Sequence, residues 1–171
     1  MNAASPQQTQ RPTIDLQQYR QALSCFGTGV TVVTARHDNM DWGMTCNSFS
    51  SVSLEPALVV WSIRKAASSL AAFTQSGGFT VNVLAQSQAD LAWQFASGSM
   101  HERFAGVSTK TLPSGRARLS ECVGWFDCDM HQIIEAGDHL MLLGRVRDFE
   151  VTNKDSLAFY RSQFGRFQAL S

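Results

Sequence analysis

The chain has 171 residues, and its 14 basic and 14 acidic side chains cancel. This length suits a single domain, and a hydrophobic content of 44% is sufficient for a packed core. Because the chain carries no net positive charge, we expect neither nucleic acid nor an anionic membrane as a partner.

The N-terminal segment, residues 1–13, is polar and rich in glutamine. It has no apolar centre of the kind that a signal peptide needs, and no part of the chain approaches the roughly 20 apolar residues of a membrane-spanning helix. We therefore expect a disordered tail over residues 1–13, one domain over residues 14–171, and a cytoplasmic protein.

The cysteines indicate buried free thiols. None of them lies in a C-x-x-C pair, the spacing typical of a zinc site or a redox dithiol. Cys122 and Cys128 lie on one expected strand and would be about 20 Å apart if it is straight, too far for a disulfide. Buried free thiols fit a reducing compartment. The histidines show no metal-ligand spacing with cysteines or acids, so we expect no metal site.

The first elements form a helix and a hairpin. Asp15 followed by Gln18 resembles a capping box and predicts a helix that runs to about Phe26. β-Branched residues then predict a strand over 30–35. A polar turn leads to a second expected strand over 42–53, and the two strands should pair as a hairpin.

Downstream of Pro56 the pattern predicts two strands and two helices. The strands are expected over 58–63 and 79–84, and the helices over 68–75 and 87–96.

The last part of the sequence is dominated by two long strands. Residues 97–118 are expected to form a long loop, a kind of segment that is often functional. Alternating patterns predict strands over 121–134 and 138–151, with a tight link between them. A helical turn is expected to begin at Ser156.

The short links decide the fold class. The alternation of strands and helices would also suit a parallel α/β sheet, but parallel strands need long crossover connections. The two direct strand-to-strand links therefore favour antiparallel pairing. We expect a mainly β fold, a small closed or split barrel with a few flanking helices.

The first of three polar clusters is Thr45-Cys46-Asn47-Ser48, in the middle of an expected strand. Its Thr, Asn and Ser side chains can bond the carbonyl and N–H edge of a flavin ring. The alternative is a solvent-facing edge strand.

The second cluster runs from Ser62, Ile63 and Arg64 to Ser68 and Ser69, where a strand ends and a helix begins. A helix start presents unpaired N–H groups and a partial positive charge, and it therefore holds phosphate well. The alternative is an ordinary N-cap beside solvated cations.

The third cluster is Gly137-Asp138-His139, at the start of a long strand. Such a histidine can orient a nicotinamide or assist proton movement, and the alternative is a structural or surface histidine beside a turn. Gly27-Thr28-Gly29 is no dinucleotide fingerprint, because it follows a helix and precedes a strand. The three clusters in this order favour a flavin site in a redox enzyme.

In this order the motifs resemble the flavin reductase family that serves two-component monooxygenases. The resemblance covers about Tyr19 to Val151. The stretches that carry it are Phe26–Thr34, Gly43–Pro56, Phe79–Leu84, Arg103-Phe104, and Gly137-Asp138-His139 leading to Gly144-Arg145-Val146. The chain departs from many relatives at Glu55-Pro56, where they have Pro-Pro, and at Ser68-Ser69, where they have Ser-x-Thr.

The resemblance implies a Greek-key split β-barrel of the FMN-binding type and a homodimer with the flavin near the subunit interface. It implies hydride transfer from NADH, with NADPH possible, to FMN or FAD, and a separate monooxygenase that receives the reduced flavin. The alternatives are a flavin-binding electron carrier that holds its flavin tightly and a non-enzymatic barrel that binds a partner protein. Arg116 and Arg118, in the long loop, leave NADPH open as a donor.

The resemblance also implies roles for individual residues. Thr45, Asn47 and Ser48 would border the isoalloxazine ring, with Cys46 between them. Ser62, Arg64, Ser68 and Ser69, together with Ile63, would handle the ribityl-phosphate arm. His139 is the expected catalytic residue beside the nicotinamide and the flavin. The remaining expected cofactor neighbours are Asn82, Phe104 and Tyr160.

Overall fold

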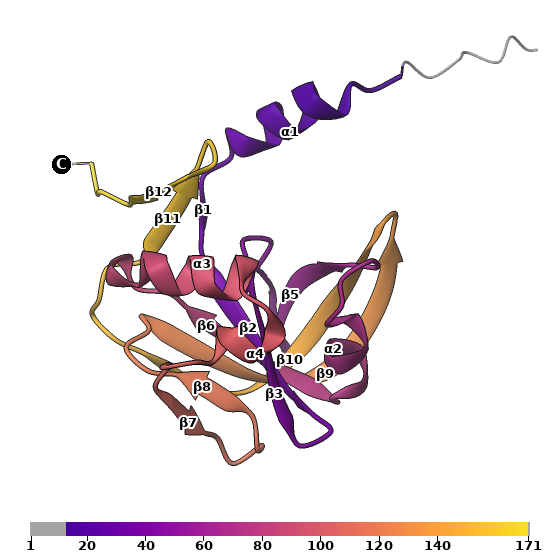
Figure 1. Ribbon diagram of the computed structural model, residues 1–171, viewed down its shortest axis with the longest axis vertical. Helices are drawn as coiled ribbons and strands as arrows, with labels where there is room; N and C mark the ends of the chain where they lie inside the picture. The colour runs from indigo at the N-terminus through magenta and orange to yellow at the C-terminus, as the bar shows by residue number, and fades with distance from the viewer. Residues whose placement is uncertain (1–12, 171) are drawn as a thin grey trace, which may run out of the picture.

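A seven-stranded antiparallel sheet forms the centre of the computed structural model, which describes residues 13–170 (Figure 1). Its strand order is β3-β2-β6-β9-β10-β5-β4. The strands are β2 (Thr31–His37), β3 (Met40–Cys46), β4 (Ser50–Leu54), β5 (Ala57–Arg64), β6 (Gly78–Val83), β9 (Gly124–Ala136) and β10 (His139–Val151). Of the expected tail, residues 1–12 lie outside the described residues.

Both expected hairpins are confirmed as antiparallel pairs. β2 and β3 pair from Thr31 with Cys46 to His37 with Met40. β9 and β10 turn at Gly137, whose φ of 64° favours glycine. These links are short because the strands are neighbours in the sheet, as the sequence indicated.

The expected strand over 42–53 is wrong in one important respect. It consists of two strands, β3 and β4, which form the opposite ends of the seven-stranded sheet. Residues 47–49 alone carry the chain from one end to the other, so these ends lie at most about 14 Å apart at this point. We call this place the seam of the sheet.

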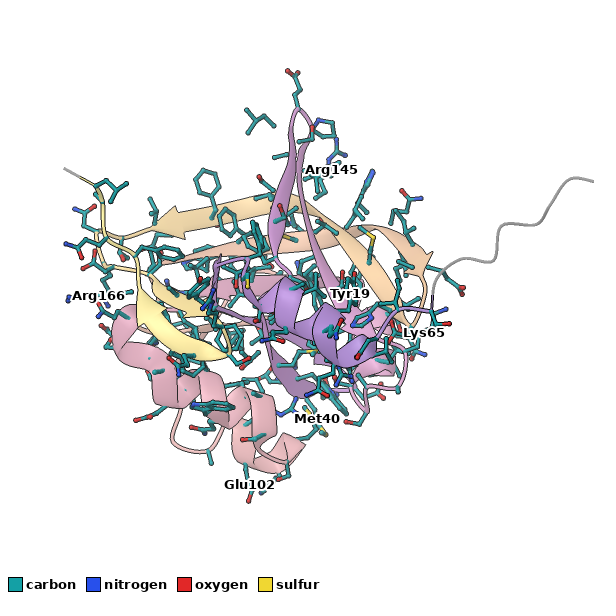
Figure 2. All side chains as sticks on the ribbon, turned by 90° about the horizontal axis from the view of Figure 1, so that it is seen from above. Tyr19, Met40, Lys65, Glu102, Arg145 and Arg166 are labelled. Atoms are coloured by element: carbon teal, nitrogen blue, oxygen red, sulfur yellow. The ribbon has the colours of Figure 1, made fainter. Side chains whose placement is uncertain are left out.

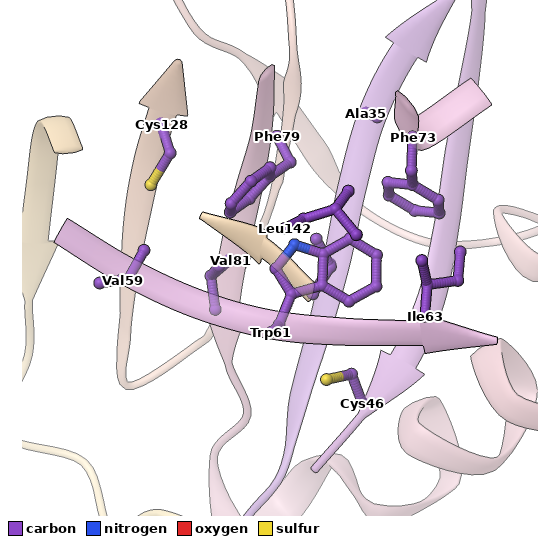
Figure 3. Packing of buried hydrophobic residues seen from close by; sticks show 11 residues of the cluster. Ala35, Cys46, Val59, Trp61, Ile63, Phe73, Phe79, Val81, Cys128 and Leu142 are labelled. Carbon is purple, nitrogen blue, oxygen red and sulfur yellow. The ribbon is translucent and has the colours of Figure 1, made fainter. Parts of the chain in front are cut away.

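The sheet wraps around one hydrophobic core. Side chains from β2, β3, β5, β6, β9 and β10 pack into a single cluster, and Trp61 lies at its centre (Figure 3). Trp61 is fully buried, with its ring 4.9 Å from that of Phe73 and 5.8 Å from that of Phe79. A sheet that encloses a core and remains open at one line is a split barrel. The expected mainly β class is confirmed.

Helices cover the sheet where the sequence placed them. These are α2 (Leu70–Gln75) and α3 (Ala89–Ser97), the latter preceded by the 3₁₀ turn η1 (Gln86–Gln88). Figure 1 shows α3 lying across one end of the sheet, where Phe95 and its neighbours form a second buried cluster.

The expected loop over 97–118 contains structure of its own. It begins with the short helix α4 (Met100–Arg103), where the Glu102 carboxylate accepts hydrogen bonds from the backbone N–H and the hydroxyl of Ser99. It continues into a small hairpin of β7 (Thr109–Thr111) and β8 (Ala117–Leu119).

The C-terminal helical turn that we expected is absent from residues 156–170. The chain there forms the hairpin of β11 (Leu157–Tyr160) and β12 (Gln163–Arg166), which makes a second sheet with β1 (Thr28–Gly29). Arg161 and Ser162 make the turn with φ of 49° and 63°. Because neither is glycine, the turn carried little signal in the sequence.

The N-terminal helix α1 (Leu16–Ser24) extends away from the rest of the molecule (Figure 1). Its start is as expected, because the Asp15 side chain accepts hydrogen bonds from the backbone N–H groups of Gln17 and Gln18. None of its residues is buried. Its apolar stripe therefore faces solvent in the single chain.

All four cysteines are free, and three are buried. Burial raises the pKa of the Cys122 thiol to about 11 and that of the Cys128 thiol to about 12. Cys25 is exposed, and this departs from the expectation for it. Between residues 13 and 170, no helix combines the length and the apolar character that crossing a bilayer requires.

Candidate functional site

Two of the predicted clusters lie side by side at one end of the sheet. β5 and the start of β10 are neighbours, so that Arg64 faces His139 and Ser62 faces Met141 in the ladder. The backbone N–H of Lys65 donates to the carbonyl oxygen of Asp138 over 2.9 Å. The end of the second cluster is thus tied to the third cluster through the backbone.

The first cluster joins them at the seam. The backbone N–H of Ser62 donates to the Ser48 hydroxyl over 2.9 Å, and this hydroxyl is also 3.3 Å from the Ser62 carbonyl oxygen. Ser48 and Asn47 are both exposed. The structure therefore brings the Asn47–Ser48 link, the Ser62–Lys65 segment and His139 to one surface.

The helix start differs from the expectation in its details. α2 begins at Leu70, so Ser68 and Ser69 both precede it. The Ser69 side chain is buried, with its hydroxyl 3.9 Å from the Met44 sulfur, and it makes no capping bond to α2. Arg64 and Ser68 are exposed and present the polar groups of this segment.

His139 is paired with its neighbour in the chain. Its Nδ1 lies 2.7 Å from Oδ1 of Asp138, and 35% of its side chain is exposed. The hydrogen bond from His139 lowers the pKa of the Asp138 carboxyl group, and the nearby Arg64 guanidinium lowers it further.

An apolar hollow of about 180 Å³ adjoins the first cluster. It lies between the end of β3, α3 and the C-terminal hairpin, and its lining residues are Val30, Thr45, Cys46, Asn47, Trp93, Ala96, Phe159 and Phe164. The Thr45 hydroxyl donates to the Ala92 carbonyl oxygen over 2.6 Å, which ties β3 to α3. Cys46 is buried and belongs to the main core. Of the polar residues that line this hollow, only Asn47 is exposed.

The remaining expected cofactor neighbours are Ile63, Asn82, Phe104 and Tyr160. Asn82 is fully buried, where its amide donates to the Val32 carbonyl oxygen and accepts from the Leu119 N–H. Phe104 packs edge-on against Phe95 at the end of α4. Tyr160 lies on β11 in the second sheet. Ile63 is fully buried in the main core. Because Asn82 and Ile63 are both fully buried, neither presents its side chain to the surface that Ser48 and His139 share.

The arginines of the long loop are engaged in ion pairs. Arg116 is buried and its Nε donates to Asp127 over 2.7 Å. Arg118 bonds Glu150 over 3.1 Å and lies over the Trp125 ring.

Comparison with known proteins gives the family. Residues 23–168 match the model of the flavin reductase like domain. The chain belongs to the flavin reductase family. The assignment as a flavin reductase made from the sequence is thereby confirmed.

The relatives of this flavin reductase cover almost its whole length. It is 38% identical over 162 residues to a flavin reductase of Pseudomonas putida, which covers 94% of this chain and 95% of that protein. It is 37% identical over 152 residues to the HsaB reductase subunit of a flavin-dependent monooxygenase of Rhodococcus jostii, covering 88% of this chain and 77% of that subunit. Other curated relatives are longer, and the chain spans 48% of the trigonelline monooxygenase reductase component of Acinetobacter baylyi.

Solved structures show the same fold. The NADH:FAD oxidoreductase SgcE6 of Streptomyces globisporus, solved with NAD and FAD fragments, superposes with a TM-score of 0.85 at 33% identity, covering 92% of this chain and 98% of that one.

Two residues that line the hollow, Trp93 and Phe164, were not expected from the sequence. Their contact, with ring centroids 5.4 Å apart, joins α3 to a hairpin that the sequence did not predict.

Proposed function

We propose that this flavin reductase transfers a hydride from NADH to FMN or FAD and releases the reduced flavin to a separate monooxygenase. The observation that carries the proposal is the meeting of three polar segments at one surface beside the seam, in a member of this family. When donor and acceptor are bound, the C4–H bond of the nicotinamide breaks and its electron pair forms the N5–H bond of the flavin. The protein has to hold the two rings face to face.

The residues serve three parts of the ligands: the polar edge of the flavin ring, the phosphate arm and the two reacting rings. Asn47 and Ser48 offer an amide and a hydroxyl to the polar edge of the isoalloxazine. Arg64 and Ser68 offer a cation and a hydroxyl to the phosphate of the ribityl arm. His139, at the start of β10 and opposite Arg64 in the ladder, offers the imidazole to the reacting rings.

The test measures NADH oxidation with catalytic amounts of protein and excess free FMN or FAD. Many turnovers per chain are expected, and anaerobic ultrafiltration should recover reduced flavin in the filtrate. Turnover that stops after one equivalent of bound flavin would instead indicate an electron carrier. The same assay with FMN and FAD in parallel decides the preferred flavin.

The preferred hydride donor is NADH. The two loop arginines that could have bound the additional phosphate of NADPH are occupied, since Arg116 is buried with Asp127 and Arg118 is paired with Glu150. We expect kcat/KM to be higher with NADH than with NADPH, as measured by initial rates with each donor.

We further propose that the protein is a homodimer in which α1 contacts the second copy. Leu16, Tyr19 and Leu23 on one stripe of α1 are 51–67% exposed, and the following Phe26 is 78% exposed. A helix of nine residues is too short to persist in water without packing. A second copy of the chain supplies the packing that the single chain does not.

The dimer is tested by sedimentation velocity. Leu23→Asp should shift the protein toward the monomer, because it places a carboxylate in the apolar stripe. Gln18→Asp, on the same helix outside that stripe, is the matched control. A monomeric wild type, or equal sedimentation of the two variants, contradicts the arrangement.

The three buried free thiols support a reducing compartment such as the cytoplasm.

A further inference from the structure

We propose that Asp138 is a positioning residue, which holds His139 in the tautomer that carries its proton on Nδ1 and leaves Nε2 to meet the bound ligand. This inference rests on the proposed function, since it gives His139 a defined reacting atom. It assigns to Asp138 a task other than that of a turn residue.

The geometry identifies which nitrogen carries the proton. Oδ1 of Asp138 lies 2.7 Å from Nδ1 of His139, within the range of a charge-assisted hydrogen bond. An ionised carboxylate only accepts hydrogen bonds, so Nδ1 must be the donor. The other ring nitrogen, Nε2, is then the atom available to a flavin or a nicotinamide.

The pKa of the Asp138 carboxyl group is lowered chiefly by its hydrogen bond with His139, so the group is an ionised acceptor at neutral pH. Arg64 faces His139 across the ladder between β5 and β10 and lowers the pKa of the Asp138 carboxyl group, after the larger effect of His139 itself. Lys65 is neutralised by its ion pair with Glu135, at 3.1 Å. The local field therefore favours an acceptor at Asp138 throughout the neutral pH range.

The contact does not serve to hold the turn. The Asp138 side chain is 85% exposed, and an ion pair on the surface contributes little to stability. Backbone features hold this turn: the positive φ of Gly137, the ladder between β9 and β10, and the hydrogen bond from the Lys65 N–H to the Asp138 carbonyl oxygen. Removal of the carboxylate should therefore release the imidazole and leave the hairpin in place.

The first experiment reads the tautomer directly. Long-range ¹⁵N–¹H correlation spectra of histidine-labelled full-length protein distinguish a proton on Nδ1 from one on Nε2, and His139→Ala identifies the signal. The wild type should show the Nδ1–H form. In Asp138→Ala the Nδ1–H form of His139 should no longer predominate over the Nε2–H form. Asp138→Asn keeps an acceptor oxygen and should retain part of the preference for the Nδ1–H form. An Nε2–H form in the wild type, or a spectrum of His139 that Asp138→Ala leaves unchanged, overturns the proposal.

The chain supplies a matched control in a second Asp–His pair. His37 and Asp38, at the turn between β2 and β3, approach through Nε2 at 3.4 Å. Asp38→Asn is the control variant, because asparagine tolerates the φ of 49° at this position. It should leave both the His139 signal and the reduction rate unchanged, and a change in either would show that the readout is not specific to Asp138.

The second experiment is a double-mutant cycle on the rate of flavin reduction by NADH, measured by stopped flow. Asp138→Ala should slow reduction about tenfold, the size expected for the loss of one charge-assisted hydrogen bond. Asp138→Ala added to His139→Ala should have no further effect, because Asp138 acts through the imidazole. Independent effects that multiply in the double variant would overturn the proposal. An inactive wild type would instead refute the proposed function, and the NMR experiment would still decide the tautomer.

Discussion

Replacement of Arg116 by methionine should cost the protein much of its stability without changing its choice of hydride donor. The Arg116 and Asp127 side chains are 7% and 5% exposed, and their 2.7 Å contact is the main compensation for two buried charges. Without the guanidinium, Asp127 keeps one bond from the Thr80 hydroxyl at 3.3 Å. A buried charge left without its partner costs about 3–5 kcal/mol.

This loss can be measured in two ways. Urea denaturation should show the reduced free energy of unfolding, and the midpoint of thermal unfolding should fall by roughly 6–20 °C for a protein of this size. The double variant Arg116→Met with Asp127→Leu should recover most of the stability, because no charge is then left in the interior. The ratio of kcat/KM for NADH and NADPH should stay that of the wild type in both. A single variant as stable as the wild type, or one with altered use of NADPH, would refute this reasoning.

Three further predictions concern the thiols, the core and the seam. Under native conditions one thiol per chain, that of Cys25, should react rapidly with a thiol reagent, since the other three are buried; rapid reaction of more than one contradicts the burial. Gly144→Ala should lower the free energy of unfolding by about 1–3 kcal/mol, because its Cβ would lie 2.5 Å from a ring carbon of Phe79; an unaffected urea midpoint would count against this packing. Ser48→Ala should raise the flavin dissociation constant roughly 2- to 12-fold in a fluorescence titration, as expected for one hydrogen bond, and an unchanged constant would remove Ser48 from the site.

The sequence predicted those elements whose signals are local. The hairpin of β2 and β3 and that of β9 and β10 follow from alternating residues on either side of a short polar link. The start of α1 follows from the capping side chain of Asp15. α4 could also have been found, because Ser99 and Glu102 have the spacing of a capping box.

The features that the sequence did not predict depend on contacts between distant parts of the chain. Nothing local in the run from Thr45 to Ser50 marks the point where it leaves one end of the sheet for the other, because the run remains compatible with a single strand. Asn82 resembled a ligand because it is polar within a strand, but its partners are the backbone groups of β2 and β8. A polar residue in an apolar strand can bind a ligand or can hydrogen-bond backbone groups in the interior. Only the fold distinguishes these two roles.

The three-residue link at the seam has a consequence for dynamics. It joins the two ends of the sheet covalently at one point, so that elsewhere these ends can separate without breaking the strand ladder. A ligand that contacts both Asn47 and the Ser62–Lys65 segment would hold the two ends of the sheet together. Occupancy would then be visible far from the ligand as slower amide hydrogen exchange along β3 and β4, and an empty protein would be the more easily opened form.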